Sequence, residues 1–272
     1  MFFTDRTFKP LQLYHLSQQN VSCQLAEPCE AICRYVHYYW WLEVNPGSTS
    51  LEIIPDNAID LVMAPELPEF SILYLPATER FSIPLVGPMV YVGISFRAEM
   101  ACDFFNVDHG VLKALAPGTD TTTMLAIEKM VDGVLKLSCP DELSATMDRL
   151  AKDRLACQSH KTVTPTNMDM NKVLVAMQAS IGTSGMQAVA ERFGMSDRQF
   201  RRIMSSLFGY GPKKIQRIMR LQASLKEQLQ SDSLKTDDGF YDEAHRIKEI
   251  RALTGLTPTE IHAMSEIYNS MQ

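Results

Sequence analysis

Short runs of apolar and aromatic residues dominate the chain between residues 34 and 96. The first run, RYVHYYWWLEV, ends at the turn signal Asn45-Pro46-Gly47. Five more follow, LEII, AIDLVM, FSILYL, FSIPLV and MVYVGISF, with segments rich in Pro, Asp and Glu between them. Runs of this length and spacing are typical of strands joined by turns. Six short strands in about 65 residues predict a sandwich or a barrel.

After Phe96 the apolar residues recur at helical spacing, which predicts helices in three segments, EMACDFFNV, TTTMLAIEKMVDGVLKLS and DELSATMDRLAKDRLA. The polar segment from His160, HKTVTPTNMD, is the predicted linker, and the pattern from Asp169 onward is helical only. We therefore predict an α+β chain. A β-rich domain covers 1–120, a helical connector and linker cover 121–165, and an all-helical domain covers 166–272.

Two short helices with a tight turn between them are predicted in the all-helical domain. Each has one apolar stripe, formed by Met186, Val189, Ala190 and Phe193 in the first and by Phe200, Ile203, Met204, Leu207 and Phe208 in the second. Gly194 stops the first helix and Gly209 the second. Capping boxes are predicted at Ser184 with Gln187 and at Ser196 with Gln199. This arrangement is a helix-turn-helix.

The face of the second helix opposite its apolar stripe is polar and strongly basic, with Arg198, Gln199, Arg201, Arg202 and Ser205. In a helix-turn-helix the second helix enters the DNA major groove, where Arg pairs with guanine and Gln with adenine. We expect Arg198, Gln199, Arg201 and Arg202 to read bases. The alternative is an ordinary helical hairpin with a solvated basic face.

The pattern repeats once further along the chain, because GMSDRQFRRIMSSLFGYGP (194–212) resembles GFYDEAHRIKEIRALTGLTP (239–258). We align Asp197 with Asp242, and Gly209 and Pro212 with Gly255 and Pro258. Thr257 and Glu260 predict a further capping box. A helix over 213–229, about 25 Å long, would hold two helix-turn-helix units about one DNA turn apart.

Charge is distributed unevenly along the chain, whose net charge is −6. Residues 161–272 hold 15 Lys and Arg against 12 Asp and Glu, a net of +3, and the remainder has a net of −9. Within 192–226 nine cations face only Asp197. A short basic stretch in an acidic protein predicts a local site for a polyanion.

These residues resemble the AraC/XylS-type transcriptional regulators, in which a long helix joins two helix-turn-helix units. The resemblance lies in VAERFGMSDRQFRRIMSSLFGYGPKKIQRIMRLQASL and the repeat that follows it, and covers about 170–265. YVHYYWWLE, IIPDNAIDLVM and YVGISFRAEMACDFFNV are similar, more loosely, to a sensor-like domain of some of these regulators. The resemblance implies that Glu243, His245 and Lys248 read bases in the second unit. The expected phosphate contacts are Ser205, Lys213, Lys214, Arg217 and Arg246.

The second unit departs from the family pattern in two places. The apolar, Ala-rich helix that the family has before the glycine is here the short acidic stretch SDSLKTDD (231–238). Arg246 takes a position that is usually apolar, and Ile247 one that is usually polar. We therefore expect the second unit to contribute less DNA affinity than the first.

Residues that suggest other chemistry are scattered. Cys29, Cys33 and His37 are four residues apart, but a predicted strand interrupts the spacing, so no metal site or cofactor is expected. A cupin-like barrel often carries clustered histidines, and here they are isolated. The aromatic run 38–41 alternates across a strand, so one pair of rings is a candidate for an effector pocket, with the core as the alternative. Asp56, Asn57 and Asp60 resemble a turn and cap.

The function predicted from the sequence is a DNA-binding transcriptional regulator and not an enzyme. Double-stranded DNA is the expected partner. A small-molecule effector, a second copy of the chain and, for an activator, RNA polymerase are open candidates. Charged residues among the first ten positions and the lack of a long apolar run argue against a secretory signal and a membrane span. Six scattered cysteines are typical of free thiols in a reducing cytoplasm, so we expect a cytoplasmic protein. Two alternatives remain, a DNA-associated cysteine alkyl-transfer enzyme using Cys102 or Cys139, and an interaction protein that has lost DNA binding.

Overall fold

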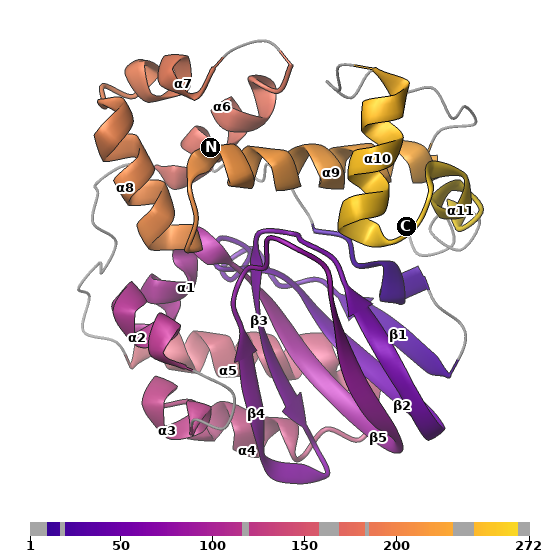
Figure 1. Cartoon of the computed structure of the whole chain (residues 1–272). Helices are drawn as coiled ribbons and strands as arrows, with labels where there is room; N and C mark the ends of the chain where they lie inside the picture. Colours follow the sequence, from indigo (N-terminus) through magenta and orange to yellow (C-terminus); the bar gives the residue numbers. More distant parts are fainter. Residues whose placement is uncertain are drawn as a thin grey trace.

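The computed structural model describes residues 10–16, 20–115, 120–157, 169–182, 185–230 and 242–265. Five antiparallel strands form one sheet in the order β1-β2-β5-β3-β4 (Figure 1). The strands are β1 (Val21–Ala26), β2 (Val36–Ile53), β3 (Ala58–Ala64), β4 (Leu67–Tyr74) and β5 (Phe81–Arg97). Helices make up the C-terminal half, so the predicted α+β class, with a β-rich region followed by helices, is confirmed.

The strand borders differ from the prediction, because two long strands replace four of the six short ones. β2 continues through Asn45-Pro46-Gly47, where its register with β5 shifts in a bulge between Val44 and Gly47. The φ of Gly47 is +123°, a value that side chains disfavour, so glycine suits the bulge. β5 continues through Pro84 and Pro88 because residues 81–91 have only β2 beside them, with Pro88 opposite the bulge, and β3 pairs only with residues 92–97.

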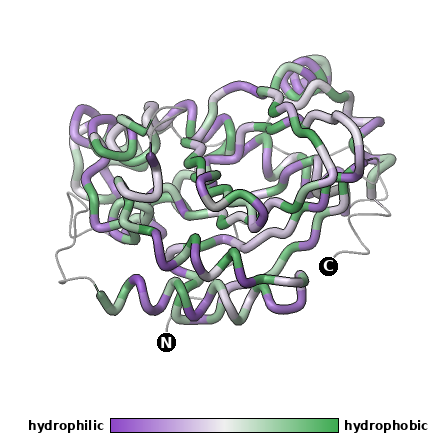
Figure 2. Tube along the Cα trace, turned by 90° about the horizontal axis from the view of Figure 1, so that it is seen from below, coloured by the Kyte–Doolittle hydropathy of each residue, from purple (hydrophilic) through white to green (hydrophobic). Residues whose placement is uncertain are grey.

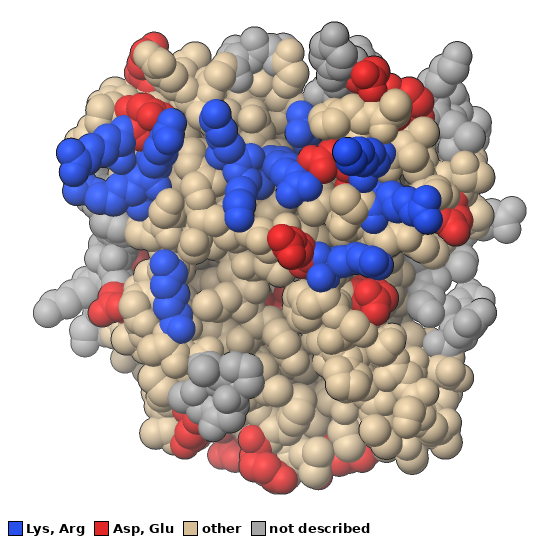
Figure 3. Space-filling model, in the orientation of Figure 1, with Lys and Arg blue, Asp and Glu red and all other residues tan. Residues whose placement is uncertain are grey.

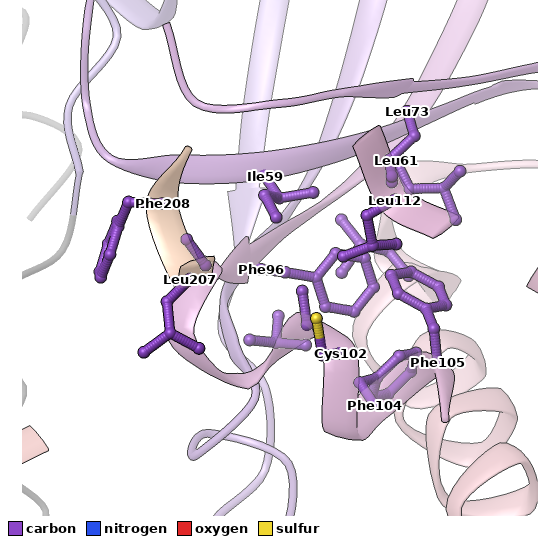
Figure 4. Close-up of a cluster of buried hydrophobic side chains, with 14 of the residues drawn as sticks. Ile59, Leu61, Leu73, Phe96, Cys102, Phe104, Phe105, Leu112, Leu207 and Phe208 are labelled. Carbon is purple, nitrogen blue, oxygen red and sulfur yellow. The ribbon is translucent and has the colours of Figure 1, made fainter. Parts of the chain in front are cut away.

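Helices cover one face of this sheet. They are α1 (Ala98–Phe105), α2 (His109–Ala114), α3 (Thr121–Leu125), α4 (Glu128–Val134) and α5 (Leu143–Ala156). The predicted helix over 121–138 is thus two helices, broken at Ala126, whose φ is +50°. Phe96 of β5 packs against Phe104 and Phe105 of α1, with ring centroids 4.7 and 4.9 Å away (Figure 4).

The aromatic run on β2 alternates between the two faces, as predicted. Tyr39 and Trp41 lie in the hydrophobic core under the helices, and the Tyr39 hydroxyl donates a hydrogen bond to Asp148 of α5 at 2.9 Å. Tyr38 and Trp40 lie in a second cluster on the opposite face. A 3₁₀ helix, η1 (Leu13–Leu16), adjoins that second face through Tyr14.

The helices of the C-terminal half are arranged around one long helix, α9 (Pro212–Gln230), with two groups at its opposite ends (Figure 1). One group is α6 (Met170–Ala179), α7 (Met186–Arg192) and α8 (Asp197–Phe208), and the other is α10 (Glu243–Thr254) and α11 (Pro258–His262). Hydrophobic and hydrophilic residues alternate along the helices, as expected where each helix buries one side (Figure 2).

The sheet and the C-terminal helices share a core. Leu207 and Phe208, at the end of α8, lie in the same apolar cluster as Ile59 and Cys102 (Figure 4). Hydrogen bonds strengthen the junction, since Tyr210 Oη donates to Asn57 Oδ1 at 2.7 Å and Asn57 Nδ2 donates to the Ile215 carbonyl at 3.1 Å. The α9 helix is therefore held directly against the sheet.

The N-terminal segment 10–16 makes a second link between the sheet and α9. The Leu11 backbone N–H donates to Gln222 Oε1 at 2.7 Å, and Gln222 Nε2 donates to the carbonyls of Leu11 and Pro55 at 3.1 and 3.0 Å. Gln222 is fully buried, so these hydrogen bonds satisfy both ends of its amide. Within the described ranges, no helix is long and apolar enough to cross a membrane.

Candidate nucleic-acid interface

Helices α7 and α8 and the turn between them form the predicted helix-turn-helix. Gly194 adopts a left-handed conformation with a φ of +68°, and the Met195 N–H donates to the Ala190 carbonyl at 3.0 Å. The predicted capping box at Ser196 is confirmed, because Gln199 N donates to Ser196 Oγ and Ser196 N donates to Gln199 Oε1. Ser184, the other predicted cap, lies outside the described residues.

The apolar stripe of α8 faces the core and its basic side faces solvent. Phe200, Met204, Leu207 and Phe208 are buried. All four predicted base-reading residues of the first unit, Arg198, Gln199, Arg201 and Arg202, are exposed, whereas Ser205 is half-buried. The packing of the stripe therefore fixes which side of α8 is presented to a ligand.

The four exposed side chains are not equally available. Arg201 forms an ion pair with Asp197, with Nε and Oδ2 2.8 Å apart, and the Gln199 amide oxygen already accepts hydrogen bonds in the capping box. Arg198 and Arg202 form no ion pair with any residue that the structure describes. They are the cations of α8 most available for a DNA contact.

The candidate phosphate contacts on α9 divide into two kinds. Lys213 and Lys214 are exposed in the first turn of the helix. Arg217 instead forms a two-pronged ion pair with Glu249 of α10, at 2.6 and 2.7 Å. These hydrogen bonds raise the pKa of Arg217 and lower that of Glu249. Arg217 therefore joins α9 to α10, and its predicted role at a phosphate would require it to leave this pair.

The second repeat has the caps of the first at a constant offset. Asp242 caps α10 by accepting from His245 N, as Ser196 caps α8, and Gly255 ends α10 with a φ of +82°, as Gly209 ends α8 with +83°. The capping box of Thr257 and Glu260 is confirmed. The offsets 242 − 196 and 255 − 209 are both 46. Residues 231–241, with the acidic stretch 231–238, lie outside the described residues.

This offset corrects our alignment of α10, in which Asp242 was paired with Asp197. Arg246 now corresponds to Phe200, and it is buried with only 1% of its surface exposed. Its guanidinium donates to the Glu243 carboxylate at 2.7 and 2.9 Å and to Gln228 Oε1 at 3.3 Å. The expected phosphate contact of Arg246 is thus wrong for this conformation, because the side chain occupies a core position.

The outward side of α10 is therefore different from the predicted set. By the offset of 46, Ala244, His245, Ile247 and Lys248 correspond to Arg198, Gln199, Arg201 and Arg202. Predicted residues His245 and Lys248 are exposed on this side, while Glu243 corresponds to Asp197 and pairs with Arg246. Ile247 is 39% exposed, so this face contains an apolar side chain where α8 has an arginine.

The distribution of charged side chains over this face of the molecule covers both repeats. Lys and Arg gather over α8, along α9 and over α10, with some acidic side chains among them, and the side chains at the opposite end of the same view, near the β3–β4 hairpin, include acidic ones but few cations (Figure 3). The cations reach from one end of α9 to the other. A polyanion that bound this face would therefore meet both groups of helices.

Other candidate chemistry receives little support from the geometry. Cys102 is buried, and burial raises the pKa of its thiol to about 11, the opposite of what an activated nucleophile needs. His109 Nδ1 lies 3.9 Å from its sulfur. Cys29 and Cys33 lie in the loop before β2, and within the described ranges no three His, Cys, Asp or Glu side chains cluster as a metal site would require.

The sequence interpretation of residues 56–60 was incomplete. Asp56 and Asn57 form a turn and a junction as expected of such residues, with Asp56 Oδ1 accepting from Ala58 N at 3.0 Å. Asp60, in contrast, lies on β3 and lines a cavity on the sheet face opposite the helices. The sequence does contain a signal for this inward position, because Asp60 is a polar residue two positions into an otherwise apolar strand.

Comparison with known proteins adds a family without an assigned function. A model of a domain of unknown function, DUF6597, matches residues 24–114, which is about one third of the chain. No curated protein shows a significant match.

Among solved structures, ToxT from Vibrio cholerae O395 is similar with a TM-score of 0.42 and 12% identity, over 91% of this chain and 98% of that one. Unsaturated fatty acid-bound wild-type ToxT from Vibrio cholerae strain SCE256 gives 0.41 and 11%, over 90% and 94%. Similarity at this level assigns no function.

Proposed function

We propose that the chain is a sequence-specific DNA-binding transcriptional regulator of the AraC/XylS type. The observation that carries the proposal is α8, whose apolar stripe is buried against α7 and α9 and whose outward side holds Arg198 and Arg202 without ion-pair partners in the described structure. A helix positioned in this way can place its first turns against base edges in the major groove.

The second repeat extends the interface. Nineteen residues of α9 span about 28 Å at 1.5 Å per residue, close to the 34 Å of one DNA turn. With α8 at one end and α10 at the other, the two helices are spaced to meet successive major grooves on one face of a duplex. Lys213 and Lys214 lie at the α8 end of α9 and are the proposed phosphate contacts.

In this proposal residues 166–272 bind DNA, and residues 1–120 form a sensor domain that the connector 121–165 joins to it. The acidic charge of the first part and the basic stretch of the second support this division. Because the two parts share one hydrophobic core, we expect DNA binding to be measured best on the full chain.

The test is selection of duplexes from a random library by the purified full chain, followed by sequencing. The chain is expected to enrich one motif with two half-sites about one DNA turn apart. The double variant Arg198→Ala with Arg202→Ala should lose enrichment of one half-site, whereas Lys129→Ala, which removes an exposed cation of α4, should not. Absence of any enriched motif at low salt would contradict the proposal and favour an interaction protein without DNA binding.

A further inference from the structure

A cavity opens on the face of the sheet opposite the helices. It lies between β2, β3, β4 and β5 and is bordered by Gln12 and Tyr14 of the N-terminal segment. The cavity and the solvent in front of it together enclose about 550 Å³ that no protein atom occupies. Leu42, Leu51, Val62 and Leu85 contribute apolar walls.

Aromatic rings surround the space on several sides. They come from the N-terminal segment and from strands β2, β4 and β5, as Tyr14, Trp40, Phe70, Tyr74, Phe81 and Tyr91. Phe70 meets Tyr91 edge to face with centroids 5.6 Å apart, and Tyr74 stacks on Phe81 at 6.1 Å. The faces of aromatic rings carry partial negative charge and attract cations, including quaternary ammonium groups that water solvates poorly.

One carboxyl group lies among these rings. Asp60 of β3 accepts a hydrogen bond from Trp40 Nε1 at 3.3 Å, and part of its surface stays accessible because it faces the cavity. Asp56, which is nearby, is occupied otherwise, because its oxygens accept from Gln12 Nε2 at 2.7 Å and from Ala58 N at 3.0 Å. Asp60 is therefore the carboxyl group that a ligand would meet.

The charge around Asp60 has no positive counterpart in the described lining. The titratable groups that interact with it are Asp56, Tyr14 and Tyr38, and none of them is a base. Among the described residues that line the cavity there is no Lys, Arg or His. An anionic ligand would find no positive partner here, whereas a cation would supply a counter-charge to an ionised Asp60.

We propose that this cavity binds a small, largely apolar organic cation, with its charge beside the Asp60 carboxylate and its apolar part among the aromatic rings. The site does not depend on DNA binding by the C-terminal helices. If both proposals hold, such a cation is the chemical class of the effector.

Proton release gives the proposal a quantitative signature. Burial and the neighbouring Asp56 raise the pKa of Asp60 to about 8. At neutral pH the empty cavity thus holds a protonated carboxyl group, and a permanent cation binds with loss of that proton to solvent. Affinity for the cation should then rise with pH up to about 8 and level off above it. Burial also raises the pKa of Asp56, to about 6, so its ionisation adds to the rise.

The test uses three probes with the full chain in nuclear magnetic resonance titrations. Phenyltrimethylammonium and tert-butylbenzene have the same shape and differ in charge, and phenylacetate carries the opposite charge. We expect the cation to bind at least tenfold more tightly than the other two at pH 8.5 and to lose at least tenfold in affinity at pH 6.5. Binding of tert-butylbenzene should not change with pH.

Two variants locate the effect. Asp60→Asn should abolish the preference for the cation and its pH dependence, while tert-butylbenzene still binds, which shows that the cavity is intact. Glu52→Gln removes an exposed carboxylate from β2, next to two lining residues but on the other face, and should change nothing. Equal affinity for the cation and its neutral isostere, or tighter binding of phenylacetate, would overturn the proposal. Neither result depends on whether the chain binds DNA.

Discussion

Helices α8 and α10 begin at an equivalent cap, end at an equivalent glycine and are each twelve residues long. Their sides are nevertheless composed in different ways. In α8 the core position of Phe200 is aromatic and the outward position of Arg201 is charged, whereas α10 has Arg246 inside and Ile247 outside. Caps therefore define where a helix lies, and the distribution of charge around it defines what it can bind.

The two helices also join α9 differently. Leu207 and Phe208 of α8 belong to an apolar cluster that continues into α9 through Ile215 and Met219. At the other end the apolar contacts of Ile250 and Leu253 are supplemented by the ion pair of Arg217 and Glu249. We expect the first junction to be insensitive to pH and salt and the second to respond to both.

The largest effect should come from exchanging core positions. Phe200→Ala removes a fully buried ring from the first repeat and should cost about 3–5 kcal/mol of unfolding free energy. At the equivalent position, Arg246→Met keeps the volume and leaves the half-exposed Glu243 to water, but it removes the donor to the buried Gln228 Oε1, so the loss should be about 1–3 kcal/mol. Urea denaturation measures both. A larger loss for Arg246→Met than for Phe200→Ala would mean that the ion pair is essential to the second repeat.

The next effect concerns DNA affinity. Arg198→Ala should weaken binding to the selected motif by about 1–3 kcal/mol and relax the base preference at one position. His245→Ala, at the place that corresponds to Gln199, should weaken binding less, because α10 presents fewer cations. Fluorescence anisotropy with the motif and with single-base variants measures both, and Lys129→Ala is the charge-matched control. If His245→Ala cost more than Arg198→Ala, the second repeat would be the main reader.

Only part of the difference between α8 and α10 could be predicted from the sequence. The caps, the apolar stripe and the exposed face of α8 follow from spacing alone, because local rules decide them. The burial of Arg246 was indicated only by its place at a position that is usually apolar in the family, because its contacts depend on Gln228 of another helix and our pairing of Asp197 with Asp242 placed α10 one residue out of register. Long strands β2 and β5 were missed for a similar reason, because a bulge and an edge position tolerate the Pro and Gly that normally mark turns.

The cavity shows more clearly what cannot be predicted from the sequence. Asp60 reads in sequence as part of a polar turn, and its neighbours Trp40, Phe70 and Tyr91 come from three other strands. Only the pairing of these strands brings the rings together around the carboxyl group. Inward-pointing positions can be predicted from alternation, but the space that they leave unfilled cannot.

A smaller effect should separate phosphate contacts from base contacts. Lys213 is exposed in the first turn of α9, just after α8, and in the proposed arrangement it contacts a phosphate. Lys213→Ala should weaken all DNA sequences alike and reduce the slope of log affinity against log salt concentration by about 1. Salt titrations on the selected motif and on a scrambled duplex measure this. A loss confined to the motif would place Lys213 at a base.

The smallest effect concerns the ion pair between α9 and α10. Glu249 has its pKa lowered by the hydrogen bonds from Arg217. A carboxylate with a lowered pKa stabilises the fold above its ordinary pKa of about 4.3, and this contribution disappears as the pH falls through the folded value. Since the Arg217 side chain is 37% exposed, solvent screens the pair, and Glu249→Gln should cost only about 1 kcal/mol at pH 7.

The pH dependence distinguishes this contribution from lost packing. The stability difference between the chain and Glu249→Gln should shrink as the pH falls through the lowered pKa of Glu249, because the carboxylate then becomes neutral, as the glutamine is. Glu30→Gln, which changes an exposed carboxylate before β2, should show no difference over the same pH range. A cost that stayed constant over that range would show that Glu249 acts through packing, and the two junctions of α9 would then differ in their residues but not in the physical nature of their contacts.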